Sequence, residues 1–173
     1  MKVFKGVFIA LTILIVSCES KSTGGDFTRD DVSFTYPEGW SITDSDSLDG
    51  AGFYLSLEKS GYDASGLLTI TWINGMLDAD DYLNIIKDEF KSQEVLDGLD
   101  FEMAGEGAFN NKKSLSCEFN FETLGLKHRG IVHVFLEGNK TYSIIRQEAL
   151  EDSVENKQGF DAIETSFKLA NNL

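Results

Sequence analysis

The chain has 173 residues, with 15 basic and 29 acidic side chains and a formal net charge of −14 at pH 7. Binding to nucleic acid depends on clustered lysine and arginine that displace counterions from the phosphates, and the sequence has no such cluster. The charge therefore excludes a nucleic-acid partner. It also disfavours electrostatic attraction of the folded body to an anionic bilayer, so membrane attachment would rest on a lipid alone.

The first 17 residues have the pattern of a secretion signal. Lys2 and Lys5 give a positive start, and residues 7–16 are apolar. Ten residues of helix reach about 15 Å, whereas the hydrocarbon core of a bilayer is about 30 Å thick. We therefore expect residues 1–17 to be a signal peptide that is removed, and not a transmembrane span.

The sequence Ile15-Val16-Ser17-Cys18 resembles the lipobox of bacterial lipoproteins. The resemblance implies cleavage between Ser17 and Cys18, transfer of diacylglycerol to the Cys18 sulfur, and further acylation by a fatty acid such as palmitate. Several acyl chains hold a protein on a membrane, whereas one chain does so only marginally. The alternative is an ordinary signal peptide that happens to end in cysteine.

These features predict a lipid-anchored protein of the bacterial cell envelope. The acidic run associated with surface export is absent after Cys18, which favours an anchor that faces the periplasm. Residues 18–26 are polar and contain glycine, so they are interpreted as a flexible tether, and residues 27–173 are long enough for one globular domain. Cys117 is the only cysteine besides Cys18, so the domain depends on its hydrophobic core and not on a disulfide.

The first half of the domain is predicted to contain four strands. Alternation of apolar and polar residues, or a run rich in β-branched residues, indicates strands at 32–36, 40–42, 53–57 and 67–73. Pro37-Glu38-Gly39 supplies a turn, and residues 44–52 are interpreted as a loop because of their composition.

A helix is predicted over residues 78–94. Asp78 suits the capping position, because its carboxylate can accept hydrogen bonds from free amides of the first turn. Apolar side chains then recur at helical spacing, and the set is Tyr82, Ile85, Ile86 and Phe90.

The second half of the domain reads as an antiparallel meander followed by a helix. Strands are predicted at 102–109, 115–121, 127–136 and 142–146, with turns at 110–111, 124–125 and 138–139. Asp152 and Glu155 resemble a capping box, and the closing helix has an apolar face of Phe160, Ile163 and Phe167. About eight strands and two helices predict an α+β fold.

Two segments resemble PsbP-like domains, a superfamily that includes the photosystem II subunit PsbP and the envelope protein DcrB. The first is Phe34-Thr35-Tyr36-Pro37-Glu38-Gly39-Trp40, which resembles the opening hairpin. The second combines Tyr142-Ser143-Ile144 with the closing helix of residues 160–167. The resemblance covers about residues 27–169 and implies an antiparallel sheet of six to eight strands flanked by two main helices, an α/β/α sandwich. The members diverge in function but share binding to other proteins without catalysis, and no site residue carries over.

Few residues are candidates for chemistry. His128 and His133 are five apart on one predicted strand, so they point to opposite faces and cannot share a metal. His128 is expected at the surface, and His133 is expected to be partly buried. Cys117 lies among apolar residues and is expected in the core. No set of nucleophile, base and orienting group is identified.

The acidic residues Asp44, Asp46 and Asp49 invite comparison with a calcium loop. The EF-hand pattern fails because Leu48 occupies the fifth position, so an acidic solvated loop is expected. No metal, cofactor or catalytic residue is therefore predicted. The leading hypothesis is a non-enzymatic, membrane-tethered binding or assembly protein with an unidentified envelope partner, bound at an exposed sheet face or near Trp40. The alternatives are a hydrolase whose site gathers dispersed carboxylates, and a module that binds a small ligand or calcium.

Overall fold

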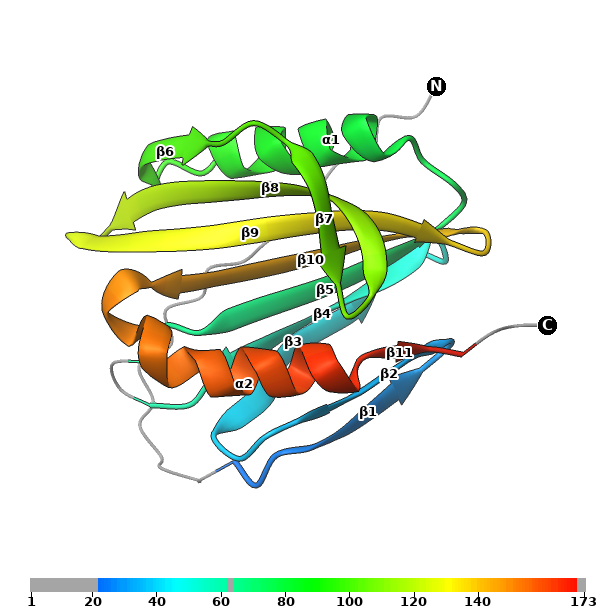
Figure 1. Ribbon diagram of the computed structural model, residues 1–173, viewed down its shortest axis with the longest axis horizontal. Helices are drawn as coiled ribbons and strands as arrows, with labels where there is room; N and C mark the ends of the chain where they lie inside the picture. Colours follow the sequence, from blue (N-terminus) through cyan, green and yellow to red (C-terminus); the bar gives the residue numbers. More distant parts are fainter. Residues whose placement is uncertain (1–21, 62–63, 171–173) are drawn as a thin grey trace.

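An antiparallel sheet of eight strands forms the centre of the computed structural model, which describes residues 22–61 and 64–170 (Figure 1). Its strand order is β3-β4-β5-β10-β9-β8-β6, and β7 also pairs with β8. The strands are β3 (Trp40–Ser47), β4 (Gly52–Lys59), β5 (Leu67–Asn74), β6 (Asp97–Phe101), β7 (Gly105–Phe109), β8 (Lys112–Thr123), β9 (Leu126–Glu137) and β10 (Lys140–Ala149).

A smaller antiparallel sheet of three strands packs beside the large one. It consists of β1 (Gly25–Arg29), β2 (Val32–Tyr36) and β11 (Lys168–Leu169), with β2 in the middle. The last residues of the described chain therefore pair with a strand near its beginning, at Lys168↔Ser33 and Leu169↔Val32.

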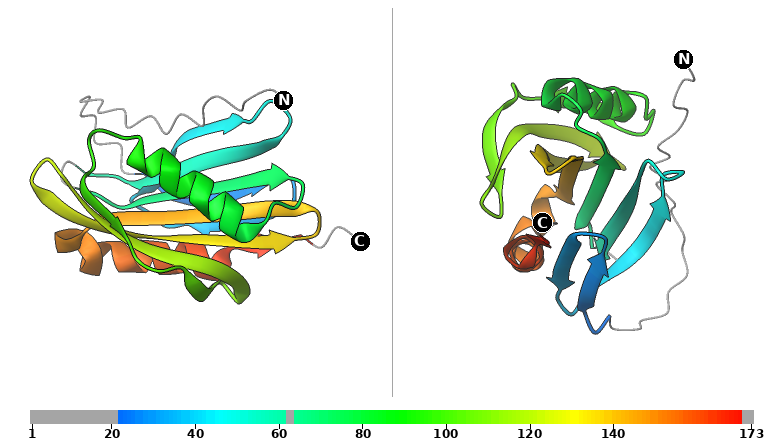
Figure 2. Two further views of the ribbon diagram at one scale, coloured as in Figure 1. Left: turned by 90° about the horizontal axis from the view of Figure 1, so that it is seen from above. Right: turned by 90° about the vertical axis from the view of Figure 1, so that its right-hand side faces the viewer.

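Two helices lie on opposite faces of the large sheet, as the end-on view of Figure 2 shows. Helix α1 (Ala79–Lys91) connects β5 to β6, whereas α2 (Ser153–Ser166) follows β10 and a short 3-10 turn (Leu150–Asp152). The Asp78 side chain caps α1 as predicted, accepting hydrogen bonds from the backbone amides of Asp80 and Asp81 at 3.0 and 3.1 Å. The α+β class and the sheet flanked by two helices are confirmed.

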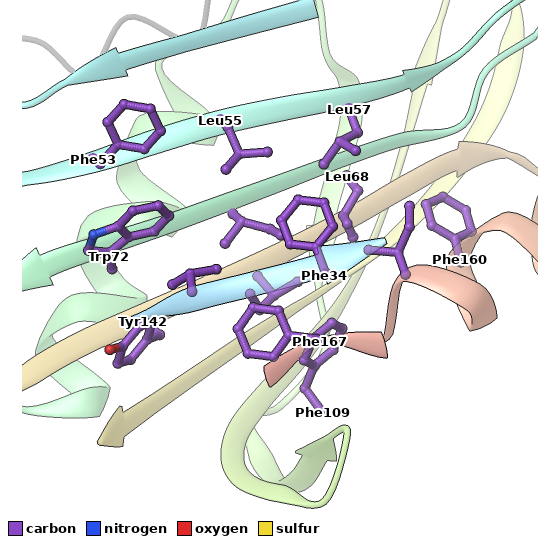
Figure 3. Close-up of a cluster of buried hydrophobic side chains, with 14 of the residues drawn as sticks. Phe34, Phe53, Leu55, Leu57, Leu68, Trp72, Phe109, Tyr142, Phe160 and Phe167 are labelled. Carbon is purple, nitrogen blue, oxygen red and sulfur yellow. The ribbon is translucent and has the colours of Figure 1, made fainter. Parts of the chain in front are cut away.

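The larger hydrophobic core lies between the large sheet, the small sheet and α2. It is rich in aromatic rings, and Figure 3 shows side chains from β2, β4, β5, β10 and α2 converging on it. Phe160 and Ile163 of α2 are buried there with Phe167, as predicted for the closing helix. Cys117 is a free, buried cysteine, so it forms no disulfide. Burial of the large aromatic rings stabilises the domain instead.

A second core lies under α1 on the other face of the sheet. Alternate residues of β8 and β9 form its floor, including Cys117 and Phe119, and Leu83 and Phe90 of α1 cover them. Ile85, predicted to be on the apolar face of this helix, is instead exposed, because the buried stripe runs through Leu83. This core includes no residue of β3 or β4, so the same face of those two strands has no helix above it.

The absence of a helix over β3 explains one wrong prediction. Residues 44–52 were expected to form a loop, but β3 continues to Ser47 and pairs with β4 beyond an irregularity between Ile42 and Asp44. The Asp44 and Asp46 side chains are exposed on the uncovered face, where charged residues remain hydrated within a strand. Composition alone therefore indicated a loop where a strand exists.

Three further boundaries differ from the prediction. The predicted strand at 102–109 is shorter than expected, because β7 covers only Gly105–Phe109. The strand β6 before it was not predicted, and the two strands pair with different halves of the 12-residue strand β8. The predicted tether 18–26 extends too far, because Gly25 already pairs with Tyr36 in β1. The strands β1 and β11 were not predicted, since each is short and mostly polar and depends on β2 for its partner.

The capping box predicted for the second helix does not form. Asp152 is the residue before α2, but its side chain makes no capping hydrogen bond and accepts one from the Ser65 hydroxyl at 2.6 Å. The carboxylate therefore joins the β4–β5 connection to the start of α2.

Gly159 is the position at which α2 packs closest to Trp40. A Cβ atom on Gly159 would lie 2.1 Å from the indole nitrogen of Trp40, which is itself buried. Glycine to alanine in a helix ordinarily stabilises a protein by about 1 kcal/mol. Here Gly159→Ala is expected to lower the free energy of unfolding in urea by about 2 kcal/mol, because the packed ring has to move. The control Thr165→Ala, at an exposed position of the same helix, is expected to leave it unchanged or slightly higher; a stabilised Gly159→Ala protein would contradict the packing.

Candidate functional site

The predicted cleavage and lipidation residues, Ser17 and Cys18, lie outside the described residues, as do the whole predicted signal peptide and residues 18–21 of the predicted tether. The described chain begins at Ser22, whose backbone oxygen accepts a hydrogen bond of 3.0 Å from the Gly39 amide. The Ser22 hydroxyl also donates to the Trp40 carbonyl. These contacts place the start of the described chain against the turn between β2 and β3.

We call the end of the molecule that contains this turn the entry end. Strand pairing places other connections at the same end. Trp40 at the start of β3 pairs with Lys59 at the end of β4, and Leu67 at the start of β5 pairs with Gln147 near the end of β10. Ala149 at the end of β10 pairs with His128 near the start of β9. The entry end lies toward the left of Figure 1. Its described residues are 22–24, 37–39, 60–61, 64–66, 92–96, 124–126 and 150–154.

The two histidines lie on opposite faces of β9, as predicted. His128 stacks on Phe121, a residue of the core under α1, with ring centroids 4.9 Å apart. It is therefore half-buried, whereas the sequence predicted an exposed side chain. His133 points to the other face, toward Phe109. The histidines therefore share no site.

His133 lies within hydrogen-bond distance of one hydroxyl group, an arrangement that a serine hydrolase also uses. The Ser114 oxygen is 3.0 Å from Nδ1 of His133. Burial, assisted by the positive charge of Arg146, lowers the pKa of His133 to about 4. A base that weak accepts a proton poorly at neutral pH, and the charged neighbour is a cation in place of the orienting carboxylate of a triad. The pair is therefore a partly buried structural contact, as predicted for His133.

Cys117 and Trp40 are both buried. The Cys117 thiol donates to the Glu102 carbonyl at 3.1 Å and lies in the core under α1, as predicted. Trp40 packs against Phe160 with ring centroids 5.0 Å apart, so it cannot present an aromatic surface to a partner. Trp40 itself is therefore not the partner surface, and a surface near it stays a prediction.

The acidic residues compared with a calcium loop do not converge. Asp44 accepts a hydrogen bond from the Tyr54 hydroxyl at 3.0 Å across β3 and β4. Burial of the phenol is the main cause that raises the pKa of Tyr54, and this hydrogen bond adds to it. Asp49 lies in the turn after β3 with a positive φ of 49°. Within residues 22–61 and 64–170, no group of three or more histidine, cysteine, aspartate or glutamate side chains is placed to hold a metal ion.

A buried ion pair that the sequence did not indicate joins the two sheets. Asp31, in the turn between β1 and β2, contacts the Lys140 ammonium and accepts a hydrogen bond from the Tyr142 hydroxyl. Burial by itself raises the pKa of Asp31, but the hydrogen bonds from Lys140 and Tyr142 outweigh it and hold that pKa below the usual value. Burial and the Asp31 carboxylate raise the pKa of Tyr142. The cluster fixes the small sheet onto the large one.

The other buried carboxylate is also paired with a cation. Glu148 accepts hydrogen bonds from Nε and Nη2 of Arg129 at 3.1 and 2.9 Å on one of its oxygens. It lines a cavity of about 130 Å³ under the start of α2, together with Arg146 and Lys157. A larger, shallow depression of about 480 Å³ lies between Asn110 and α2 and includes Asp161 and Glu164. Asp161 is paired with Lys157, and Glu164 accepts a hydrogen bond from the Asn110 amide.

Comparisons with known proteins agree with this geometry. No protein-family model matches the sequence, and no curated protein sequence matches it. The solution structure of cyanobacterial PsbP (CyanoP) from Synechocystis sp. PCC 6803 superposes with a TM-score of 0.59 at 15% identity, covering 90% of this chain and 98% of that one. The chain has a PsbP-like fold.

Two other solved structures overlap with this PsbP-like domain. A crystal structure from Bacteroides thetaiotaomicron VPI-5482 has a TM-score of 0.55 at 14% identity, covering 87% of this chain and half of that chain. LpqN, described as involved in cell envelope biogenesis of Mycobacterium tuberculosis, has a TM-score of 0.48 at 10% identity, covering 80% of this chain and 83% of that one. Among residues 22–61 and 64–170 of the PsbP-like domain, no helix is long and apolar enough to cross a membrane.

Proposed function

We propose that this chain is an exported lipoprotein of the bacterial cell envelope, in which a PsbP-like domain is held at the membrane by lipid on Cys18 and acts as an accessory protein for a partner of the envelope. The observation that carries the proposal is the lipobox-like sequence at residues 15–18, which follows an apolar run and a positive start. Ser22, which is hydrogen-bonded to Gly39, is only four residues after Cys18.

The proposal assigns no reaction to the domain. The buried carboxylates Asp31 and Glu148 each contact a basic side chain, and burial and the charge of Arg146 lower the pKa of His133. Beside the part of the large sheet that α1 does not cover, residues 43–47 of β3 are polar and exposed. These features support binding to another protein over the chemistry of a hydrolase or a calcium module.

The anchor is tested by comparing the two cysteines of the chain in a bacterial host. Cys18→Ser is expected to abolish incorporation of labelled palmitate and to move the protein from the membrane fraction to the soluble fraction, because thioether attachment needs the sulfur. Cys117→Ala, which changes the buried cysteine, is the matched control and is expected to remain in the membrane fraction with its label. A Cys18→Ser protein that still takes up palmitate and sediments with membranes would contradict the proposal.

The accessory role is tested by affinity purification of the full chain from detergent-solubilised membranes of its native cells. A stoichiometric envelope protein is expected to copurify with the parent chain. Repeated purification without any such partner would count against the role while leaving the anchor intact.

A further inference from the structure

The exposed apolar side chains of the domain are concentrated at the entry end. The described residues include nine large hydrophobic side chains that are exposed, and five of them lie in or next to the connections at this end. They are Val95, Leu124, Leu126, Leu150 and Val154. Single exposed apolar residues are common on proteins, but a concentration at one end of a fold marks an interaction surface.

These five residues lie on neighbouring connections at that end. Val95 precedes β6, whose Asp97 pairs with Glu122 close to the β8–β9 turn that carries Leu124. Leu126 begins β9, and the 3-10 turn containing Leu150 contacts β9 before leading to Val154 at the start of α2. In Figure 1 the β8–β9 turn and the beginning of α2 both lie at the left of the molecule.

Leu124 has a backbone conformation that argues against a role in folding. Its φ is +53°, a value that residues with a branched apolar side chain rarely adopt. The other non-glycine residues with positive φ in the described chain are aspartate or asparagine, at positions 30, 49, 110 and 111. Asn-Gly would suit the positive φ of this turn between β8 and β9 better than Leu124-Gly125 does. The leucine side chain is 87% exposed, so packing within the fold does not explain its presence. Such an outlier points to selection for a contact outside the fold.

The contact of Ser22, close in sequence to Cys18, indicates the occupant of this surface. Ser22 is bonded to the β2–β3 turn at the same end, and Cys18 is four residues earlier, which allows at most about 14 Å of extended chain. A lipid on Cys18 would therefore keep this end at the bilayer surface. The acidic side chains of Glu94, Asp97 and Glu151 near the series disfavour attraction to anionic headgroups, so the contact would be apolar.

We propose that the apolar connections of the entry end, with Leu124 at their tip, insert into the surface of the phospholipid bilayer that holds the Cys18 anchor, and thereby set the orientation of the domain. This inference rests on the proposed function, because it requires the anchor. The domain then stands with its entry end on the membrane and its opposite end, with the β1–β2 and β9–β10 turns, directed away.

The test uses the mature lipidated protein, which starts at Cys18 and carries Cys117→Ala, reconstituted into phosphatidylcholine vesicles. A fluorescent probe sensitive to polarity is attached through Leu124→Cys or, as the matched control, through Met76→Cys, which is 66% exposed in the β5–α1 connection away from the entry end. Nitroxide-labelled lipids are expected to quench the probe at position 124 by about twofold, as for groups held in the interface, and to leave the probe at position 76 unquenched.

The outcomes separate the inference from the anchor. Vesicles that float with the protein while both probes remain unquenched would overturn the bilayer contact and leave the anchor intact. Protein that does not float with the vesicles would overturn both. A change in the fluorescence of the probe at position 124 that occurs with native membranes and not with phosphatidylcholine vesicles would overturn the bilayer contact in favour of a protein partner.

Leu124→Asn gives an independent prediction about the turn. Because asparagine accepts positive φ, the variant is expected to have a melting temperature equal to or above that of the parent protein, although it loses a large apolar group. Differential scanning calorimetry measures this directly. A clearly lower melting temperature would show that the leucine side chain supports the fold, and it would contradict the argument for an external contact.

Discussion

Replacement of Asp31 by alanine is expected to lower the free energy of unfolding by about 3 to 5 kcal/mol, measured by urea denaturation at pH 7. The carboxylate and the Lys140 ammonium are both largely buried, so the variant leaves a cation without its partner in a poorly hydrated place. The Tyr142 hydroxyl, which is fully buried, also loses its acceptor.

Two further variants define the origin of this effect. Asp161→Ala removes the exposed ion pair with Lys157 on α2 and is expected to change stability by no more than about 0.5 kcal/mol. Adding Lys140→Met to Asp31→Ala is expected to recover part of the loss, because the orphaned charge is removed. An Asp31→Ala protein within 1 kcal/mol of the parent, a bound on the scale of an average point mutation, would contradict the role assigned to this pair.

The second large effect is a dependence of stability on pH that comes from His133. Its pKa in the folded protein is about 4, whereas an unfolded histidine has a pKa of about 6.5. Below pH 6.5 the unfolded chain binds a proton that the folded protein does not bind, so stability falls as the pH is lowered toward 4. The difference between the two pKa values corresponds to a loss of about 3 kcal/mol by pH 4.

The variant His133→Asn isolates this contribution. Asparagine can keep a polar atom near the Ser114 hydroxyl but does not titrate, so the loss of stability between pH 6.5 and 4 is expected to be much smaller than in the parent. His128→Asn, the same substitution on the other face of β9, is the matched control. Equal slopes for the parent and His133→Asn would contradict the assignment.

Asp31 acts in a separate pH range. Its pKa is held below the ordinary aspartate value, so its contribution to stability is present above that value and is lost as the pH falls through the lowered pKa. The histidine effect ends only below its folded pKa of about 4, once the folded protein binds the proton as well, so destabilisation that continues below about pH 3 belongs to carboxylates such as Asp31.

Local patterns in the sequence were sufficient for much of the fold. Alternation from Leu115 to Phe121 predicted the strand β8, and the spacing of Phe160 and Ile163 predicted the buried face of α2. The turns at 110–111, 124–125 and 138–139 were recognised because their residues suit positive φ or tight hairpins, although Leu124 is an exception to that rule. Such features depend on neighbours a few residues apart.

The remaining features depend on contacts between distant residues. Asp31 and Lys140 are 109 residues apart, and no periodicity relates them. The strand β11 has two residues and exists only because β2 accepts it as a partner. Asp44 and Asp46 suggested a loop, because sequence composition does not reveal that α1 leaves β3 and β4 uncovered. The exposed apolar series at the entry end likewise becomes visible only once the strands are paired.

Peptide mass spectrometry of the chain extracted from membranes of its native cells tests the central claim most directly. The account predicts that the protein starts at Cys18 and that this residue carries the added mass of diacylglycerol on its sulfur. A chain that retains residues 1–17, or one in which Cys18 is present without lipid, would contradict it.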